Sequence, residues 1–141
     1  MRFMDSACGI RTKNFHSITK HTFISSEGHE IKMRVFKPSH TNEKLPIVVY
    51  YHGGGWTMGD LDTHDVLCRE LADDGRCVVV AVDYRMGPEH RFPAAPDDCL
   101  AATRWLMAQA GELGLDATRF AVGGDSAGGN LAAVVSLAWR D

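Results

Sequence analysis

The sequence contains no apolar run long enough to cross a membrane. Its longest apolar stretches lie at 47–51 and 77–82, far short of the roughly 20 residues that a membrane-spanning helix needs. The first ten residues include Arg2, Asp5 and Ser6, so they lack the continuous apolar segment of a secretory signal peptide. These absences predict a cytoplasmic protein with no membrane span.

A strong charge of either sign is also missing. The 141 residues carry 18 acidic and 15 basic side chains, which gives a formal net charge of −3. Proteins that bind nucleic acid usually show a clear excess of positive charge, as do many that bind anionic membranes. We therefore expect neither as a partner. Apolar residues make up 45% of the chain, which suits one globular core and argues against disorder.

Cysteine is scarce, and none of the four residues lies in C-x-x-C or zinc-site spacing. Cys77 opens an apolar run, while Cys68 and Cys99 fall in segments predicted to be helical. We interpret these cysteines as buried thiols in a reducing compartment, with a disulfide or a metal site as the alternative.

The alternation of residue types predicts a β-hairpin followed by β-α units. Residues 1–15 form a loose lead-in, and 16–44 form the hairpin region, with a turn at Ser25-Ser26-Glu27-Gly28. From Leu45 the order is β-α-β-α-β-α, which indicates an α/β protein with a parallel sheet covered by helices on both faces. The predicted strands are 16–24, 30–37, 46–51, 76–82 and 120–123, and the predicted helices are 62–73, 97–111 and 126–139.

A candidate nucleophile lies between the last predicted strand and the last predicted helix. Gly124-Asp125-Ser126-Ala127-Gly128 matches G-x-S-x-G in the strand–turn–helix context that this motif requires. Small residues two positions to each side of Ser126 allow a sharp turn that exposes its hydroxyl. The alternative is an ordinary glycine-rich turn in which Ser126 only caps the helix. We expect Asp125 to support the loop.

A second glycine-rich segment, His52-Gly53-Gly54-Gly55-Trp56, follows the first buried strand. Consecutive glycines allow backbone N–H groups to approach a substrate oxygen on which negative charge develops. We assign the donors to Gly54 and Gly55, with Gly53 as a further candidate and Ala127 completing the oxyanion hole. The alternatives are a flexible loop or a phosphate site, but no Lys-Ser or Lys-Thr pair follows the glycines.

Other polar residues near these motifs have structural interpretations. His52 is expected to brace the glycine loop rather than to act as general base, and Trp56 either lines the pocket or packs. Glu89 and His90 suggest an acid–base pair, but their position among prolines favours a structural turn. No metal site is expected at the cluster of possible ligands around the start of the first predicted helix, which we interpret as capping and beginning that helix: Asp60, Asp62, His64 and Asp65.

Several separated blocks together resemble the hormone-sensitive lipase family of α/β-hydrolase esterases. They are Tyr51-His52-Gly53-Gly54-Gly55-Trp56, Gly59-Asp60, Asp83-Tyr84-Arg85, Pro88-Glu89-His90, Phe92-Pro93-Ala94-Ala95 and Gly124-Asp125-Ser126-Ala127-Gly128-Gly129-Asn130. The resemblance implies hydrolysis of small carboxylic esters through an acyl-enzyme on Ser126, without a cofactor. It implies scaffold roles for the blocks at 83–85 and 88–90.

The chain departs from this family after the nucleophile. The family order is Ser, then Asp or Glu, then His, but all seven histidines precede Ser126 and Asp141 is the only acid after it. We therefore expect residues 1–141 to form a partial, truncated α/β-hydrolase domain, with the strand at 120–123 as an unpaired sheet edge. The alternatives are complementation by a second chain or a non-catalytic module that binds a small molecule, as in a plant hormone receptor that resembles this family.

Overall fold

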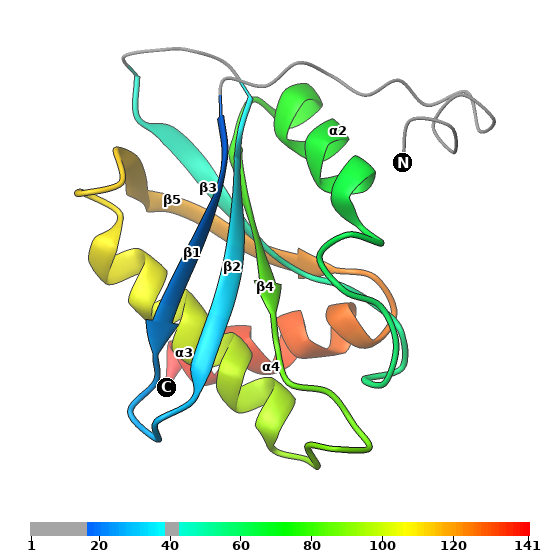
Figure 1. Cartoon of the computed structure of the whole chain (residues 1–141). Helices are drawn as coiled ribbons and strands as arrows, with labels where there is room; N and C mark the ends of the chain where they lie inside the picture. Colours follow the sequence, from blue (N-terminus) through cyan, green and yellow to red (C-terminus); the bar gives the residue numbers. More distant parts are fainter. Residues whose placement is uncertain (1–16, 39–42) are drawn as a thin grey trace, which may run out of the picture.

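The computed structural model describes residues 17–38 and 43–141. Within these residues, five strands and three helices follow one another in the order predicted from the sequence (Figure 1). Their bounds are β1 (Ser17–Ile24), β2 (Glu30–Lys37), β3 (Leu45–Tyr51), α2 (Asp65–Gly75), β4 (Val78–Asp83), α3 (Ala94–Gln109), β5 (Leu115–Gly124) and α4 (Ala127–Arg140). The predicted lead-in at 1–15 and residues 39–42 of the predicted loop lie outside the described residues.

The five strands form one mixed sheet in the order β1-β2-β4-β3-β5. β1, β2 and β4 pair antiparallel, whereas β4, β3 and β5 run parallel. The hairpin and the parallel β-α units predicted from the sequence are thus confirmed. In the described part of the chain β5 pairs only with β3, so it forms a sheet edge as expected. Because parallel strands end at the same edge, the segments after β3 and β5 emerge side by side.

Helices cover both faces of the sheet, and the strands contribute alternate side chains to each face (Figure 1). In β4, Val78, Val80 and Val82 pack toward α3 and α4, while Val79 and Ala81 pack toward α2. All five are almost fully buried. This two-sided burial explains the uninterrupted β-branched run, since neither face of β4 contacts solvent.

The ends of the helices differ from the prediction by one to three residues. α2 extends to Gly75, two residues beyond the predicted end, and Arg76 adopts the left-handed cap with φ 49°. α3 begins at Ala94, three residues before the predicted start. Pro96 therefore lies inside the first turn of α3, where the missing proline N–H removes no helical hydrogen bond.

The third parallel strand is longer than the predicted segment 120–123. It pairs with β3 first at Leu115, and the pairing shifts before it resumes at Phe120. Asp116 accepts hydrogen bonds from the backbone and the side chain of Thr118 between these points. This local turn interrupts the alternation of residue types, which hid the first half of the strand from a periodicity argument.

The three cysteines in the described residues are free and buried: Cys68, Cys77 and Cys99. Burial raises the pKa of the Cys68 thiol to about 12 and that of Cys99 well above its usual value, because a thiolate is poorly solvated there. The prediction of buried thiols is confirmed for these three, and Cys8 lies outside the described residues. None of the described helices is long and apolar enough to cross a membrane.

Candidate active site

Ser126 occupies a strained turn between β5 and α4. Its φ of 53° and ψ of −116° lie in a region that residues with a Cβ rarely adopt. The side chain is exposed to solvent, whereas the next residue, Ala127, is buried. No side-chain hydrogen bond from Ser126 caps α4. The geometry therefore does not support the alternative in which this serine serves only as a helix cap.

The glycines on each side of Ser126 are required by space. A Cβ on Gly124 would lie 2.2 Å from the carbonyl oxygen of Tyr51, and one on Gly128 would lie 1.7 Å from the same oxygen. Both distances are far below van der Waals contact. The turn at 124–128, which we call the nucleophile turn, is therefore pressed against the end of β3, where the other glycine-rich segment begins.

That segment, residues 52–56, forms what we call the oxyanion loop. Gly54 has φ 131°, and a Cβ there would lie 1.9 Å from the carbonyl oxygen of Met58. Met58 N–H and Thr57 N–H both donate to Gly54 O, at 2.8 and 3.1 Å. These bonds fold the loop back on itself, so that it leaves β3 in a tight turn beside the nucleophile turn.

Asp125 connects the two segments. Its Oδ1 accepts hydrogen bonds from the Gly53 N–H at 3.0 Å and from the Tyr50 hydroxyl at 2.6 Å. His64 Nε2 lies 3.2 Å from the same oxygen. The N–H of Gly53 is thus already occupied, so we exclude Gly53 from the proposed oxyanion donors and retain Gly54, Gly55 and Ala127. The expectation that Asp125 supports the loop agrees with these contacts.

The electrostatics of this connection favour an ionised Asp125. Partial burial pushes its pKa upward, but the hydrogen bonds from Tyr50 and Gly53 and the neighbouring His64 outweigh that effect, so the pKa lies below its ordinary value. Burial, together with the hydrogen bond to Asp125, raises the pKa of Tyr50. At neutral pH the phenol therefore donates and the carboxylate accepts.

His52 is buried and contacts the oxyanion loop. It is 2% exposed, and its Nδ1 lies 2.7 Å from Gly53 O. Its ring stacks on that of Tyr84 at a centroid distance of 4.6 Å, and the Tyr84 hydroxyl donates to His52 O at 2.6 Å. These contacts agree with bracing rather than general-base chemistry. They also give Tyr84 a scaffold role, as the resemblance implied for residues 83–85.

Arg85, the next residue of that block, forms a two-pronged ion pair with Asp98 of α3. Its Nε and Nη2 donate to the two carboxylate oxygens at 2.9 and 2.8 Å. The Arg85 backbone N–H donates to the same carboxylate at 3.0 Å. Asp98 is 2% exposed, so this pair fixes the loop after β4 to the start of α3. That loop carries Glu89 and His90.

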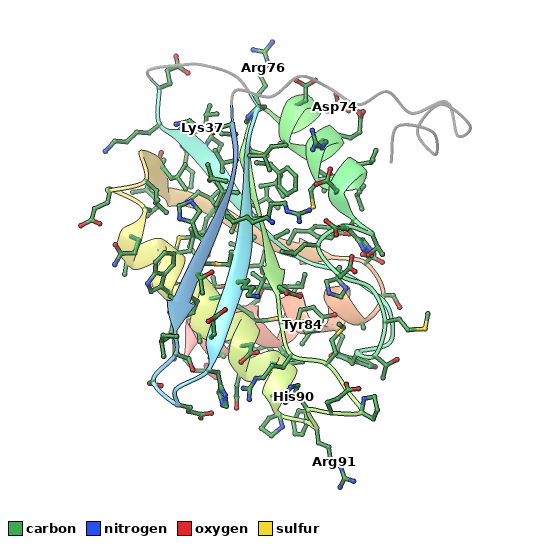
Figure 2. All side chains as sticks on the ribbon, in the orientation of Figure 1. Lys37, Asp74, Arg76, Tyr84, His90 and Arg91 are labelled. Carbon is green, nitrogen blue, oxygen red and sulfur yellow. The ribbon has the colours of Figure 1, made fainter. Side chains whose placement is uncertain are left out.

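An apolar cavity of about 330 Å³ lies beside the oxyanion loop. Trp56 and His90 contribute to its wall, so Trp56, which is 42% exposed, lines a pocket. Figure 2 shows His90 and Arg91 in the loop after β4, at the end of the molecule opposite Asp74 and Arg76. His90 N–H donates to Met86 O at 3.0 Å, as expected for a structural turn. The lining residues are Trp56, Gly87, His90, Phe92, Ala95, Pro96, Asn130, Leu131 and Val134.

The cluster around the start of α2 begins the helix as expected, with Asp65 as its first residue, but it does not cap the helix with a side chain. The N-cap residue is His64, and it makes no side-chain capping bond. Asp62 and Asp65 instead pair with Arg34 of β2, at 2.9 and 3.0 Å. Asp60 Oδ1 accepts a hydrogen bond from the Thr63 N–H at 2.8 Å. The cluster therefore attaches α2 to the sheet and leaves His64 facing Asp125.

Sequence reasoning missed two contributors to the site, Tyr50 and His64. Tyr50 lies in a continuous apolar strand, where nothing distinguishes a hydroxyl that bonds to a carboxylate from a ring that only packs. His64 carried a weak signal, because it is a histidine in the first residues after the oxyanion loop. Its position among aspartates directed attention to metal binding and capping instead.

Comparison with known proteins places these features in a family. A model of the alpha/beta hydrolase fold matches residues 48–141. Carboxylesterase NlhH of Mycobacterium tuberculosis is 53% identical over 112 residues, which cover 79% of this chain and 35% of that protein. An arylesterase of Saccharolobus solfataricus is 43% identical over 124 residues, covering 87% of this chain and 40% of that protein.

Solved structures of esterases also resemble this chain. A hyperthermophilic esterase from the archaeon Pyrobaculum calidifontis superposes with a TM-score of 0.87 at 47% identity, over 92% of this chain and 41% of that one. EstE1, a thermophilic carboxylesterase from a metagenomic library, superposes with a TM-score of 0.89 at 45% identity, over 99% of this chain and 46% of that one. The chain thus spans less than half the length of each of these relatives.

Proposed function

Because this chain belongs to the hormone-sensitive-lipase-like family of α/β-hydrolases, we propose that it supplies the nucleophile and the oxyanion hole of a carboxylic-ester hydrolase. The relatives are named as a carboxylesterase and an arylesterase, which supports a carboxylic ester as the substrate, and we propose a small one. Ser126 Oγ attacks the ester carbonyl, its proton passes to a base, and the alcohol leaves with a proton. Water then hydrolyses the acyl-enzyme and frees Ser126.

The observation that carries this proposal is the strained backbone of Ser126 in a turn held against the oxyanion loop. A non-glycine residue with this φ and ψ persists only where the surrounding packing enforces it, and such strain is characteristic of functional sites. The exposed hydroxyl is then presented beside Gly54, Gly55 and Ala127. Their N–H groups are the donors we propose for the oxyanion, each worth about 10²–10³ in rate.

The general base and its orienting acid are not assigned to this chain. The family order places them after the nucleophile, and residues 127–141 contain no histidine and only Asp141 as an acid. The histidines nearest the site have other partners, Gly53 O for His52 and Asp125 for His64. We propose that a polypeptide segment outside residues 1–141 supplies both groups. The buried free thiols support a reducing, cytoplasmic location.

The test is ester hydrolysis by the purified chain and by its Ser126→Ala variant, with a short-chain p-nitrophenyl ester as substrate. Both proteins should also be treated with a fluorophosphonate, which labels activated serines covalently. Labelling that disappears in the variant supports the nucleophile assignment, and serine-dependent turnover also requires a base. Equal behaviour of the two proteins in both assays would contradict esterase chemistry by this chain alone.

A binding module without hydrolysis is the second candidate function. The apolar cavity of about 330 Å³ beside the oxyanion loop favours it, because the cavity has room for a small apolar ligand. The same two proteins separate the candidates. A pure binding module would bind an ester equally well with Ser126 or Ala at this position and would release no alcohol product.

A further inference from the structure

We propose that His64 is a positioning residue for Ser126: its imidazole holds the Asp125 carboxylate, so that the nucleophile turn and the oxyanion loop keep one fixed geometry. This inference rests on the proposed function, because it concerns the same site. Among the hydrogen bonds and ion pairs of the described residues, none joins His64 to Ser126 or to the proposed oxyanion donors, and its polar contact with the nucleophile turn is the one with Asp125.

Three groups share one oxygen atom, Oδ1 of Asp125. Asp125 Oδ1 accepts hydrogen bonds from the Tyr50 hydroxyl of β3 and from the Gly53 N–H of the oxyanion loop. It also lies 3.2 Å from Nε2 of His64, at the start of α2. Three separate parts of the fold therefore meet at a single atom of the residue before the nucleophile. The Asp125 side chain is 48% exposed, so its orientation depends on these partners rather than on burial.

The contact with Asp125 also depends on the protonation of the His64 ring. An ionised carboxylate accepts hydrogen bonds but cannot donate them, so the contact with Asp125 requires a proton on His64 Nε2. The other ring nitrogen, Nδ1, lies 2.9 Å from Thr63 Oγ1. Partners at both nitrogens fix the rotation of the ring and direct Nε2–H toward Asp125.

His64 itself is anchored by its neighbours. Thr63 and Asp60 bond reciprocally: the Thr63 N–H donates to Asp60 Oδ1 at 2.8 Å, and the Asp60 N–H donates to Thr63 Oγ1 at 2.9 Å. α2 is also tied to β2, through the ion pair between Asp65 and Arg34. The imidazole is 20% exposed and lies 5.4 Å from the His52 ring. His64 therefore extends from a fixed segment, as a positioning group requires.

The test compares two substitutions in the full chain. His64→Phe keeps a ring but removes the donor, whereas His64→Gln retains an amide N–H that can replace Nε2–H. His21→Phe is the matched control, because His21 lies in β1, three strands from β3 in the sheet order. The readout is amide hydrogen exchange at Gly53, measured by NMR and compared with exchange at Val80 in the core.

We expect Gly53 exchange to accelerate about tenfold in His64→Phe, the effect of losing one hydrogen bond to a charged group. Exchange at Val80 should not change, and both His64→Gln and His21→Phe should resemble the wild type. Equal effects of Phe and Gln would overturn the proposal, because the donor that Gln retains would then make no difference. An unchanged Gly53 rate in His64→Phe would also overturn it.

Two further measurements keep the test decisive. The ¹⁵N chemical shifts of the His64 ring in the wild type report its protonation even if His64→Phe does not fold, and an unprotonated Nε2 at neutral pH contradicts the proposal. Fluorophosphonate labelling of Ser126 should slow about tenfold in His64→Phe and recover in His64→Gln. If the wild type is not labelled, Ser126 is not activated in this chain by itself and esterase chemistry by this chain alone fails, while Gly53 exchange still decides the role of His64.

Discussion

Gly28 in the turn between β1 and β2 differs from Gly128 beside Ser126 in the physical reason for having no side chain. Gly28 has φ +86°, and a Cβ added to it would meet nothing within 4 Å. Gly128 has no unusual φ, but its Cβ would lie 1.7 Å from the Tyr51 carbonyl oxygen. The hairpin therefore needs a backbone conformation, whereas the site needs space between two segments.

The same contrast extends to the surroundings of the two turns. The hairpin turn is closed by local bonds, Gly28 N–H to Ser25 O at 2.9 Å and Ser25 N–H to His29 O at 2.8 Å. The nucleophile turn is held by partners far away along the chain, including Tyr50 and Gly53. A substitution in the hairpin turn should therefore affect only that turn. A substitution in the nucleophile turn should also disturb the segments bonded to it, and with them the candidate site.

The largest effect is expected from Gly128→Ala. The new methyl group would overlap the end of β3, and neither backbone can move without disturbing the sheet. We expect a loss of about 3 kcal/mol in the free energy of unfolding, measured by urea denaturation. Gly111→Ala is the matched control, because a Cβ there meets nothing within 4 Å and the φ is ordinary. Similar values for the two variants would contradict the importance of space at 128.

An effect of intermediate size is expected from Ser126→Gly, which should raise the free energy of unfolding relative to Ser126→Ala. Glycine adopts φ 53° and ψ −116° readily, so this variant should be more stable than Ser126→Ala by about 1–2 kcal/mol. Both variants lack the hydroxyl and should be inert to a fluorophosphonate. Thermal unfolding of the two proteins side by side measures the difference. Equal stability would mean that the turn is not strained in solution.

The smallest effect is expected from Gly28→Ala in the hairpin. Alanine has room there but disfavours positive φ, so the free energy of unfolding should fall by about 1 kcal/mol. Gly28→Asn should lose less, because asparagine tolerates the left-handed region. The labelling rate of Ser126 should stay at the wild-type value in both variants. A change in that rate would mean that the two turns are coupled after all.

Much of the fold and part of the site followed from sequence patterns. Continuous β-branched runs identified β3 and β4, because strands buried on both faces cannot alternate with polar residues. G-x-S-x-G between a strand and a helix located the nucleophile turn, and the run of glycines located the oxyanion loop. Helix ends were less predictable, as at Arg76 and Ala94, since neighbouring conformations at a helix terminus differ little in free energy.

What the sequence alone determined is the order of strands and helices, the residue that we propose as nucleophile and the glycine-rich segment that we propose as the source of backbone N–H donors. Only the tertiary structure decided that Gly53 donates to Asp125 rather than to a substrate, and that His64 faces the nucleophile turn. Those contacts join residues separated by 72 and 61 positions, the first of which brings Gly53 within 3.0 Å of Asp125 Oδ1. Local patterns do not report such distances, because the packing of β3, β5 and α2 sets them.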